Sequence, residues 1–182
     1  MSTDTLVNHS DPLAEDACAM RLKDVLNTWR GILEDPSLQD LPYKIETNSF
    51  GQIIMSPANR KHTRYQGIII RHLCALTPDG EVHPECPVAT SDGVKAPDVA
   101  WISETRSLAE PNPLAFTTAP EVCIEVLSPS NPKQEIENKK TLYFEQGADE
   151  VWVCDDTGAM TFFKAAGAVE QSTIFPAFPR QI

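Results

Sequence analysis

Two acidic residues, Asp98 and Glu125, each lie in an apolar run with the character of a β-strand, and Lys139 follows on a predicted helix. A carboxylate in dry surroundings must pair with a cation, bind a metal ion or take up a proton, because an unpaired buried charge is costly. Two carboxylates and a nearby ammonium are the minimum set for holding a hard divalent ion against a phosphate. The spacing therefore indicates a candidate metal and phosphate site.

The strand pattern decides whether the two acids can meet. Side chains alternate along a strand, so Asp98 shares one face with Ala100, and Glu125 shares one face with Cys123. If the two strands are neighbours, about 5 Å apart, Asp98 and Glu125 converge on one sheet face. Two carboxylates so close repel each other unless a cation or a proton lies between them.

The helix pattern places the lysine. Ile136, Leu142 and Tyr143 form the apolar stripe of the predicted helix. At about 100° per residue, Lys139 points into the middle of this stripe, whereas Lys140 lies at its edge. A lysine aimed at a sheet needs an anionic partner, and Glu125 precedes this helix closely.

Structural interpretations of the same residues stay open at this level. Glu125 and Lys139 could form a purely structural buried pair. Asp98 could cap or pair with the backbone of a turn after Pro97.

Hydrophobic periodicity and turn residues predict the elements that carry these groups. The predicted helices are 14–33, 60–76, a short one within 103–118, and one that opens at 128–132 and runs to 146. The predicted strands are 43–47, 52–55, 81–83, 88–90, 94–102, 121–127, 150–154, 159–164 and an edge strand at 169–174. This order predicts an α/β fold with a mixed central sheet flanked by helices, and 121–127 as the most apolar strand is expected at its centre.

The chain length of 182 residues suits one domain, and its 41 % hydrophobic content suffices for a sizeable core. We expect a flexible N-terminus over residues 1–13 and a single domain over 14–182. No apolar run approaches the roughly 18 residues that a membrane span needs, and the N-terminus lacks the pattern of a secretion signal, so we expect a cytoplasmic protein. The five cysteines match no zinc-binding spacing, and Cys123 and Cys154 are expected to be small buried hydrophobes.

The net charge of −11 argues against avid non-specific binding to nucleic acid. The distribution of charge is uneven, because no acid occurs between Glu46 and Asp79. This segment carries the basic residues Arg60, Lys61, Arg64 and Arg71 and the histidines His62 and His72. A local basic face and an ordinary solvated helix flank are both compatible with it. For His62, a phosphate contact together with Arg64 is one interpretation, and a surface role is the one we expect.

Three stretches of the chain resemble the Uma2 family of restriction endonucleases. They are Lys95–Ala100, Ala119–Ser130, and Lys139 with Leu142-Tyr143 and the run Gly147–Asp155. The similarity extends upstream through Ile53–Pro57 and covers roughly residues 42–164. The spacing from Glu125 through Ser128-Pro129-Ser130 to Lys139 and Tyr143 is a specific part of this resemblance.

The resemblance implies the restriction-endonuclease-like fold of the PD-(D/E)xK phosphodiesterase superfamily and metal-dependent hydrolysis of DNA. It implies Asp98 and Glu125 as ligands of Mg²⁺ or Mn²⁺, and Lys139 as the group that polarises the phosphate or the attacking water. In the wider superfamily this lysine follows the acid by two residues, where this chain has Leu127; the Uma2 family places it on the next helix. Glu46 matches the further acid of the first hairpin, although an exposed strand acid is the alternative.

DNA is the partner that the resemblance implies, with Arg60, Lys61, Arg64 and Lys140 as candidate nucleic-acid contacts. Nucleases of this fold are often homodimers, but the sequence leaves the oligomeric state open. A different interpretation is a catalytically inactive interaction or regulatory domain on a nuclease fold. The net charge of −11 favours it, whereas the presence of Asp98, Glu125 and Lys139 argues against it. A hydrolase of small phosphoesters is a third, because no base-reading element is visible.

Overall fold

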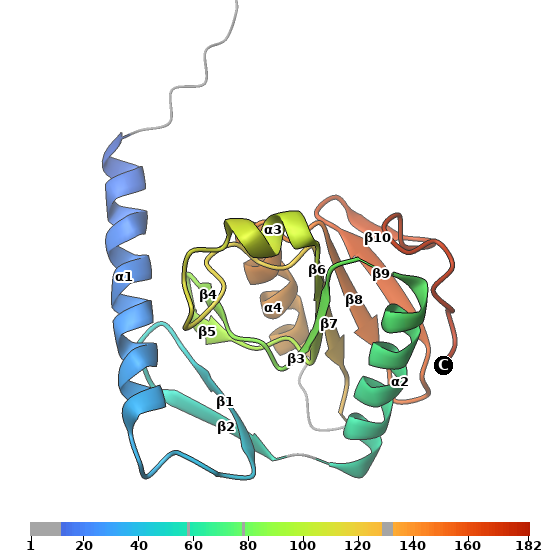
Figure 1. Ribbon diagram of the computed structural model, residues 1–182, viewed down its shortest axis with the longest axis horizontal. Coiled ribbons are helices and arrows are strands. Elements are labelled where there is room, and N and C mark those ends of the chain that lie inside the picture. The colour runs from blue at the N-terminus through green and yellow to red at the C-terminus, as the bar shows by residue number, and fades with distance from the viewer. Residues whose placement is uncertain (1–11, 58, 78, 129–132) are drawn as a thin grey trace, which may run out of the picture.

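The computed structural model describes residues 12–57, 59–77, 79–128 and 133–182, and the side chains of the first helix from Arg21 onward (Figure 1). The flexible segment expected at 1–13 falls almost entirely outside the described residues. Among the described helices, none combines the length and the apolar character needed to cross a membrane.

Fourteen helices and strands follow one another along the described chain. They are α1 (Pro12–Glu34), β1 (Tyr43–Thr47), β2 (Ile53–Pro57), α2 (Arg60–Leu76), β3 (Glu81–Pro84), β4 (Val88–Thr90), β5 (Gly93–Lys95), β6 (Val99–Ile102), α3 (Glu104–Ala109), β7 (Val122–Val126), α4 (Lys133–Glu145), β8 (Glu150–Cys154), β9 (Met160–Lys164) and β10 (Gly167–Val169).

A six-stranded sheet forms the centre of the molecule, in the order β10-β9-β8-β7-β6-β3. Strands β7 and β8 are parallel, and their other neighbours in the sheet are antiparallel. The sheet is therefore mixed and β7 is central, as the sequence predicts. Two further two-stranded sheets, β1-β2 and β4-β5, lie beside it, and the β1-β2 hairpin lies near the C-terminal end of α1 (Figure 1).

Helices cover both faces of the central sheet, which confirms the predicted α/β class (Figure 1). The alternation of β7 divides its side chains between the two layers. Its Val122, Ile124 and Val126 side chains pack with the apolar face of α2, whereas Cys123 packs with α4.

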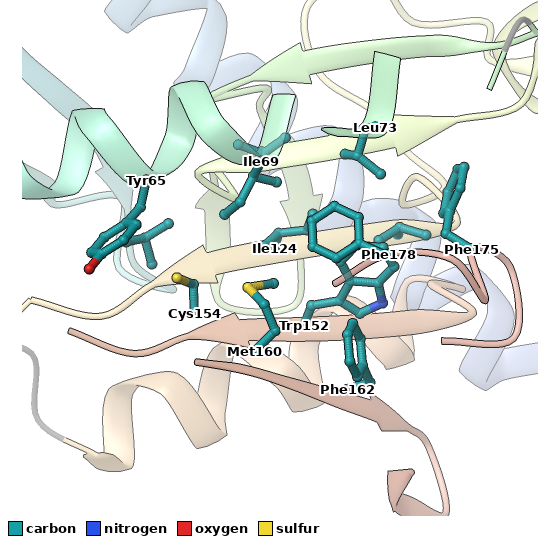
Figure 2. Packing of buried hydrophobic residues seen from close by; sticks show 13 residues of the cluster. Tyr65, Ile69, Leu73, Ile124, Trp152, Cys154, Met160, Phe162, Phe175 and Phe178 are labelled. Atoms are coloured by element: carbon teal, nitrogen blue, oxygen red, sulfur yellow. The ribbon is translucent and has the colours of Figure 1, made fainter. Parts of the chain in front are cut away.

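The larger core cluster lies between α2 and the sheet (Figure 2). Trp152 at its centre makes an edge-to-face contact with Phe162, with ring centroids 5.1 Å apart. The C-terminal segment closes the cluster through Phe175 and Phe178, which are buried against the same tryptophan. Cys154 is buried in this cluster and Cys123 in the smaller cluster beneath α4, as expected for small hydrophobes.

The prediction of one strand over 94–102 is wrong, because the chain forms two strands there that belong to different sheets. Strand β5 pairs with β4, and β6 pairs with β3 and β7. Pro97 has no N–H to donate to a ladder, and the N–H of Ala96 donates to a side-chain oxygen of Glu46 at 2.9 Å. The break places Asp98 immediately before β6.

The predicted edge strand at 169–174 is also displaced, because β10 ends at Val169. It pairs antiparallel with β9 after a tight turn. The following residues turn to Glu150 instead, whose carboxylate accepts hydrogen bonds from the N–H and hydroxyl of Thr173, both at 2.7 Å. A buried acceptor therefore directs this segment away from the sheet edge.

Candidate active site

Five charged side chains from four parts of the chain gather at one end of the central sheet. This charge cluster consists of Lys44 and Glu46 from β1, Asp98 before β6, Glu125 from β7 and Lys139 from α4. Asp98 is 2 % exposed and Glu125 3 % exposed, so their charges depend on protein partners rather than on water.

Strand register brings the two acids together. In the antiparallel pair of β6 and β7, Val99 lies opposite Ile124, so Asp98, one residue earlier, falls opposite Glu125. The backbone N–H of Val126 donates to Oδ2 of Asp98 at 2.7 Å. The predicted convergence of Asp98 and Glu125 on one face is therefore present in the structure.

Helix α4 supplies the ammonium that the sequence predicts. The Nζ atom of Lys139 lies 2.8 Å from Oε1 of Glu46 and 3.4 Å from Oε2 of Glu125. One turn later, the hydroxyl of Tyr143 donates to Oε1 of Glu125 at 2.6 Å. Positions i and i+4 share one helix face, so both side chains reach Glu125 from the same side.

Glu46 enters the cluster because the hairpin docks against β5. Thr47 accepts the N–H of Val94 with its hydroxyl and the ammonium of Lys95 with its carbonyl, both at 2.8 Å. Glu46 is 6 % exposed and accepts from the Ala96 N–H. The alternative of an exposed strand acid is therefore wrong.

Three side chains contact these acids although the sequence did not predict the contacts. They are Lys44, His62 and Tyr143. The Nζ atom of Lys44 lies 2.6 Å from Oδ1 of Asp98, and Nε2 of His62 lies 3.1 Å from the same oxygen. His62 is held in the first turn of α2, where its backbone N–H donates to Oδ1 of the capping residue Asn59 at 2.9 Å. The contact of Lys44 could have been predicted, because side chains alternate along a strand and Lys44 therefore shares the face of Glu46.

The two central acids have opposite pKa shifts. Burial alone would raise the pKa of Asp98, but Lys44 and His62 more than compensate and hold it below its usual range. Burial raises the pKa of Glu125, and the charges of Asp98 and Glu46 add to this against the opposing effect of Lys139 and Lys44. Asp98 is thus held as a carboxylate, whereas the negative charge of Glu125 is incompletely compensated.

A cavity of about 510 Å³ opens above the charge cluster. Its lining includes all five members of the cluster, residues of β2 such as Met55, and the start of α2 with Asn59 and His62. A cavity of this size accommodates a nucleotide-sized ligand.

The four candidate nucleic-acid contacts separate into two groups. Arg60, Lys61 and Arg64 are exposed on the first turns of α2, next to the cavity-lining His62. Lys140 is 8 % exposed, with its ammonium 3.6 Å from the centroid of the Phe163 ring and paired with Glu137. The structure therefore does not bring Lys140 to the basic end of α2.

The donor chemistry of the cluster suits a hard divalent ion, because carboxylate oxygens are the ligands that Mg²⁺ and Mn²⁺ prefer. Asp98, Glu125 and Glu46 supply such oxygens. Within the described ranges, no three or more His, Cys, Asp or Glu side chains are arranged as a ready metal site. Lysines lie between the carboxylates: Lys139 bridges Glu46 and Glu125, and Lys44 bridges Asp98 and Glu46.

Comparison with known proteins gives one family and one fold. The model of the Uma2 family, described as "Putative restriction endonuclease", matches residues 35–178, which is more than half of the chain. Among solved structures, a "putative nuclease belonging to DUF820" from Anabaena variabilis is 20 % identical with a TM-score of 0.57. The match covers 66 % of this chain and 71 % of that one. No curated protein matches the sequence significantly.

Proposed function

The chain belongs to the Uma2 family, described as "Putative restriction endonuclease", and on that premise we propose that it is a metal-dependent endonuclease hydrolysing DNA phosphodiester bonds. The observation that carries this proposal is the charge cluster itself, in which Asp98, Glu125 and Lys139 meet beneath an open cavity. A nuclease of this type needs carboxylates for a divalent ion and a fixed ammonium for the phosphate.

Asp98 and Glu125 would hold Mg²⁺ or Mn²⁺, with Glu46 as a third carboxylate ligand. When bound, such an ion supplies Lewis-acid polarisation of the phosphodiester and lowers the pKa of the attacking water. The protein keeps the two ligands oriented beforehand, because the N–H of Val126 fixes Asp98 and the hydroxyl of Tyr143 fixes Glu125.

Lys139 is the residue proposed to act on the phosphate. Its ammonium is held between Glu46 and Glu125 at the base of the cavity. Those two carboxylates raise the pKa of Lys139 although burial alone would lower it, so the side chain stays protonated. A fixed positive charge beside the phosphate stabilises the negative charge that develops as the phosphodiester is attacked.

DNA would approach across the first turns of α2. Arg60, Lys61 and Arg64 are exposed there and provide positive charge next to the cavity of a protein with net charge −11. Contacts of this kind neutralise phosphates and orient the strand without selecting a base sequence.

The test is a cleavage assay with plasmid and single-stranded DNA in Mn²⁺, in Mg²⁺ and in chelator. The wild type should cut only with the divalent ion. Glu125→Gln should fold, lose ion-dependent thermal stabilisation and lose cleavage, whereas Glu170→Gln, a control at an exposed acid, should behave as the wild type. Cleavage by Glu125→Gln or in chelator would contradict the assigned mechanism.

A regulatory domain without catalysis is the second candidate, which the net charge of −11 favours. It predicts no cleavage and no shift of the melting temperature with Mn²⁺ or Mg²⁺. Hydrolysis of a small phosphoester with no cleavage of DNA would instead identify the third class of function.

A further inference from the structure

We propose that Lys44 is a resident counter-ion of the charge cluster: its ammonium occupies the place beside Asp98 that a divalent ion would take, and it thereby weakens ion binding. This inference rests on the proposed metal-dependent function and assigns to Lys44 a role in setting ion affinity.

Lys44 is the cation closest to Asp98. Its Nζ atom lies 2.6 Å from Asp98 Oδ1, a shorter distance than Lys139 has to either of its carboxylates, and 3.8 Å from Glu46 Oε1. The Lys44 side chain is only 13 % exposed, so water screens this pair weakly. Lys44 thus already neutralises the ligand expected to hold the ion.

The Oδ1 oxygen of Asp98 already has two partners. Oδ2 accepts the N–H of Val126, and Oδ1 meets both Lys44 and His62. A carboxylate oxygen has about two lone-pair positions, so both positions on Oδ1 have partners. An ion that binds this oxygen must therefore displace one of the two partners. The Lys44 ammonium is the partner expected to leave, because the ion and the ammonium repel each other.

Lys44 differs in its partners from the other lysine of the cluster. Lys139 pairs with Glu46 and Glu125, and no contact joins it to Asp98 among the described residues. Lys44 instead pairs with Asp98 and Glu46, so it is the lysine of the cluster that stands beside Asp98.

Lys44 also has space into which its ammonium can move. It lines the cavity of about 510 Å³, and its four-carbon chain can turn the ammonium away from Asp98. The displaced charge would then face the space proposed for the DNA phosphate.

The experiment measures Mn²⁺ affinity by calorimetry without DNA, in the wild type and in Lys44→Met, Lys44→Gln and Lys140→Met. Loss of a like charge next to the ion should tighten Mn²⁺ binding by at least about tenfold in both Lys44 variants. The glutamine variant keeps a hydrogen-bond donor, so it separates charge from hydrogen bonding. Lys140→Met is the matched control, because Lys140 is also a buried, ion-paired lysine but lies outside the cluster, and its affinity should match the wild type.

Thermal melting gives a second readout. Without ions, the Lys44 variants should melt at a lower temperature than the wild type, and saturating Mn²⁺ should raise their melting temperature more than it raises that of the wild type. This pattern would show that ion and ammonium substitute for each other.

Equal or weaker Mn²⁺ binding by both folded Lys44 variants overturns the inference. If the wild type nonetheless shows Mn²⁺-dependent cleavage, the result contradicts only the role assigned to Lys44 and leaves the proposed function supported. Absence of Mn²⁺ binding in all proteins, together with no ion-dependent cleavage, overturns both.

Discussion

Each acid of the charge cluster differs from the others in its immediate partners. Asp98 has an ammonium, an imidazole and a backbone donor as neighbours, whereas Glu125 has a tyrosine hydroxyl at 2.6 Å and a more distant ammonium at 3.4 Å. The pKa of Asp98 is accordingly lowered and that of Glu125 raised. Of these two acids, Glu125 would gain more from a bound cation, because its charge is less well compensated.

Lys139→Met should lower single-turnover cleavage by roughly 100-fold, the scale seen when a charge-stabilising donor is removed from an active site. Ion affinity measured by calorimetry should not fall, because the partners of Asp98 are untouched and a competing positive charge is removed. A loss of Mn²⁺ binding would instead assign Lys139 to holding the carboxylates in place.

A second buried acid, Glu150, affects stability away from the cluster. It accepts hydrogen bonds from the indole of Trp152 at 2.8 Å and from Thr173. Burial alone would raise its pKa, but hydrogen bonds from Ser172, Thr173 and Trp152 reverse this, so the folded-state pKa lies below the usual value.

Glu150→Gln should therefore destabilise the protein most near neutral pH. A group with a lowered folded-state pKa contributes stability above its unfolded pKa and loses it as pH falls through the folded value. The difference in unfolding free energy between wild type and variant, from urea titrations, should shrink as pH falls below about 4.5. A difference that grows with acidity would show that the carboxylate is not the form that binds Thr173.

Among the elements, the β1-β2 hairpin contributes two of the five charged side chains of the cluster. It forms a sheet of its own, yet it supplies Lys44 and Glu46. Its position depends on its packing against β5, where Gly93 has a φ of 82° and its Cα faces the backbone of Thr47 and Asn48. A Cβ at Gly93 would lie 2.6 Å from the carbonyl oxygen of Asn48.

Gly93→Ala should push the hairpin from β5 and withdraw Lys44 and Glu46 from the cluster. We expect a loss of stability of at least about 1 kcal/mol, from backbone strain and poorer packing of the hairpin, and altered Mn²⁺ affinity. The control is Gly167→Ala, since Gly167 also has a positive φ, of 132°, but a Cβ there meets nothing within 4 Å. Equal effects in both variants would show that backbone strain alone, not the hairpin, is responsible.

At the scale of the whole molecule, the proposed function requires the protein to bind a polyanion while carrying a net charge of −11. The segment between Glu46 and Asp79 contains no acid, and helix α2 within it begins beside the cavity with its exposed arginines. The proposed association with DNA would therefore depend on a small part of the surface and should be sensitive to salt.

The double variant Arg60→Ala/Arg64→Ala should weaken binding to a DNA oligonucleotide, measured by fluorescence anisotropy in chelator, for every sequence tried. The slope of log affinity against log salt should become shallower by roughly one for each phosphate that is no longer neutralised. Arg180→Ala, which removes an exposed arginine paired with Glu170, should bind as the wild type. An unchanged slope in the double variant would place the DNA path elsewhere.

Local patterns could predict much of the site. Period-2 alternation predicted the faces of Asp98 and Glu125, and the helical period predicted that Lys139 points inward. Glu46 came from resemblance to the family rather than from its own pattern. The split of the predicted strand 94–102 was missed, because the apolar run continues across Pro97 although the ladder cannot.

The sequence by itself determined the α/β class, the central place of β7 and the faces of the acids, since these depend on the spacing of apolar residues along one element. The pairing of Lys139 with Glu125 was expected from the sequence, but only the tertiary structure decided that Lys44 meets Asp98 and that Lys139 also meets Glu46. Lys44 lies 54 positions from Asp98, and Lys139 lies 93 positions from Glu46, so these pairs depend on how the hairpin, strand and helix dock. Docking depends on how side chains pack and how closely the backbones of different elements approach each other. A periodic pattern within one element carries no information about these contacts.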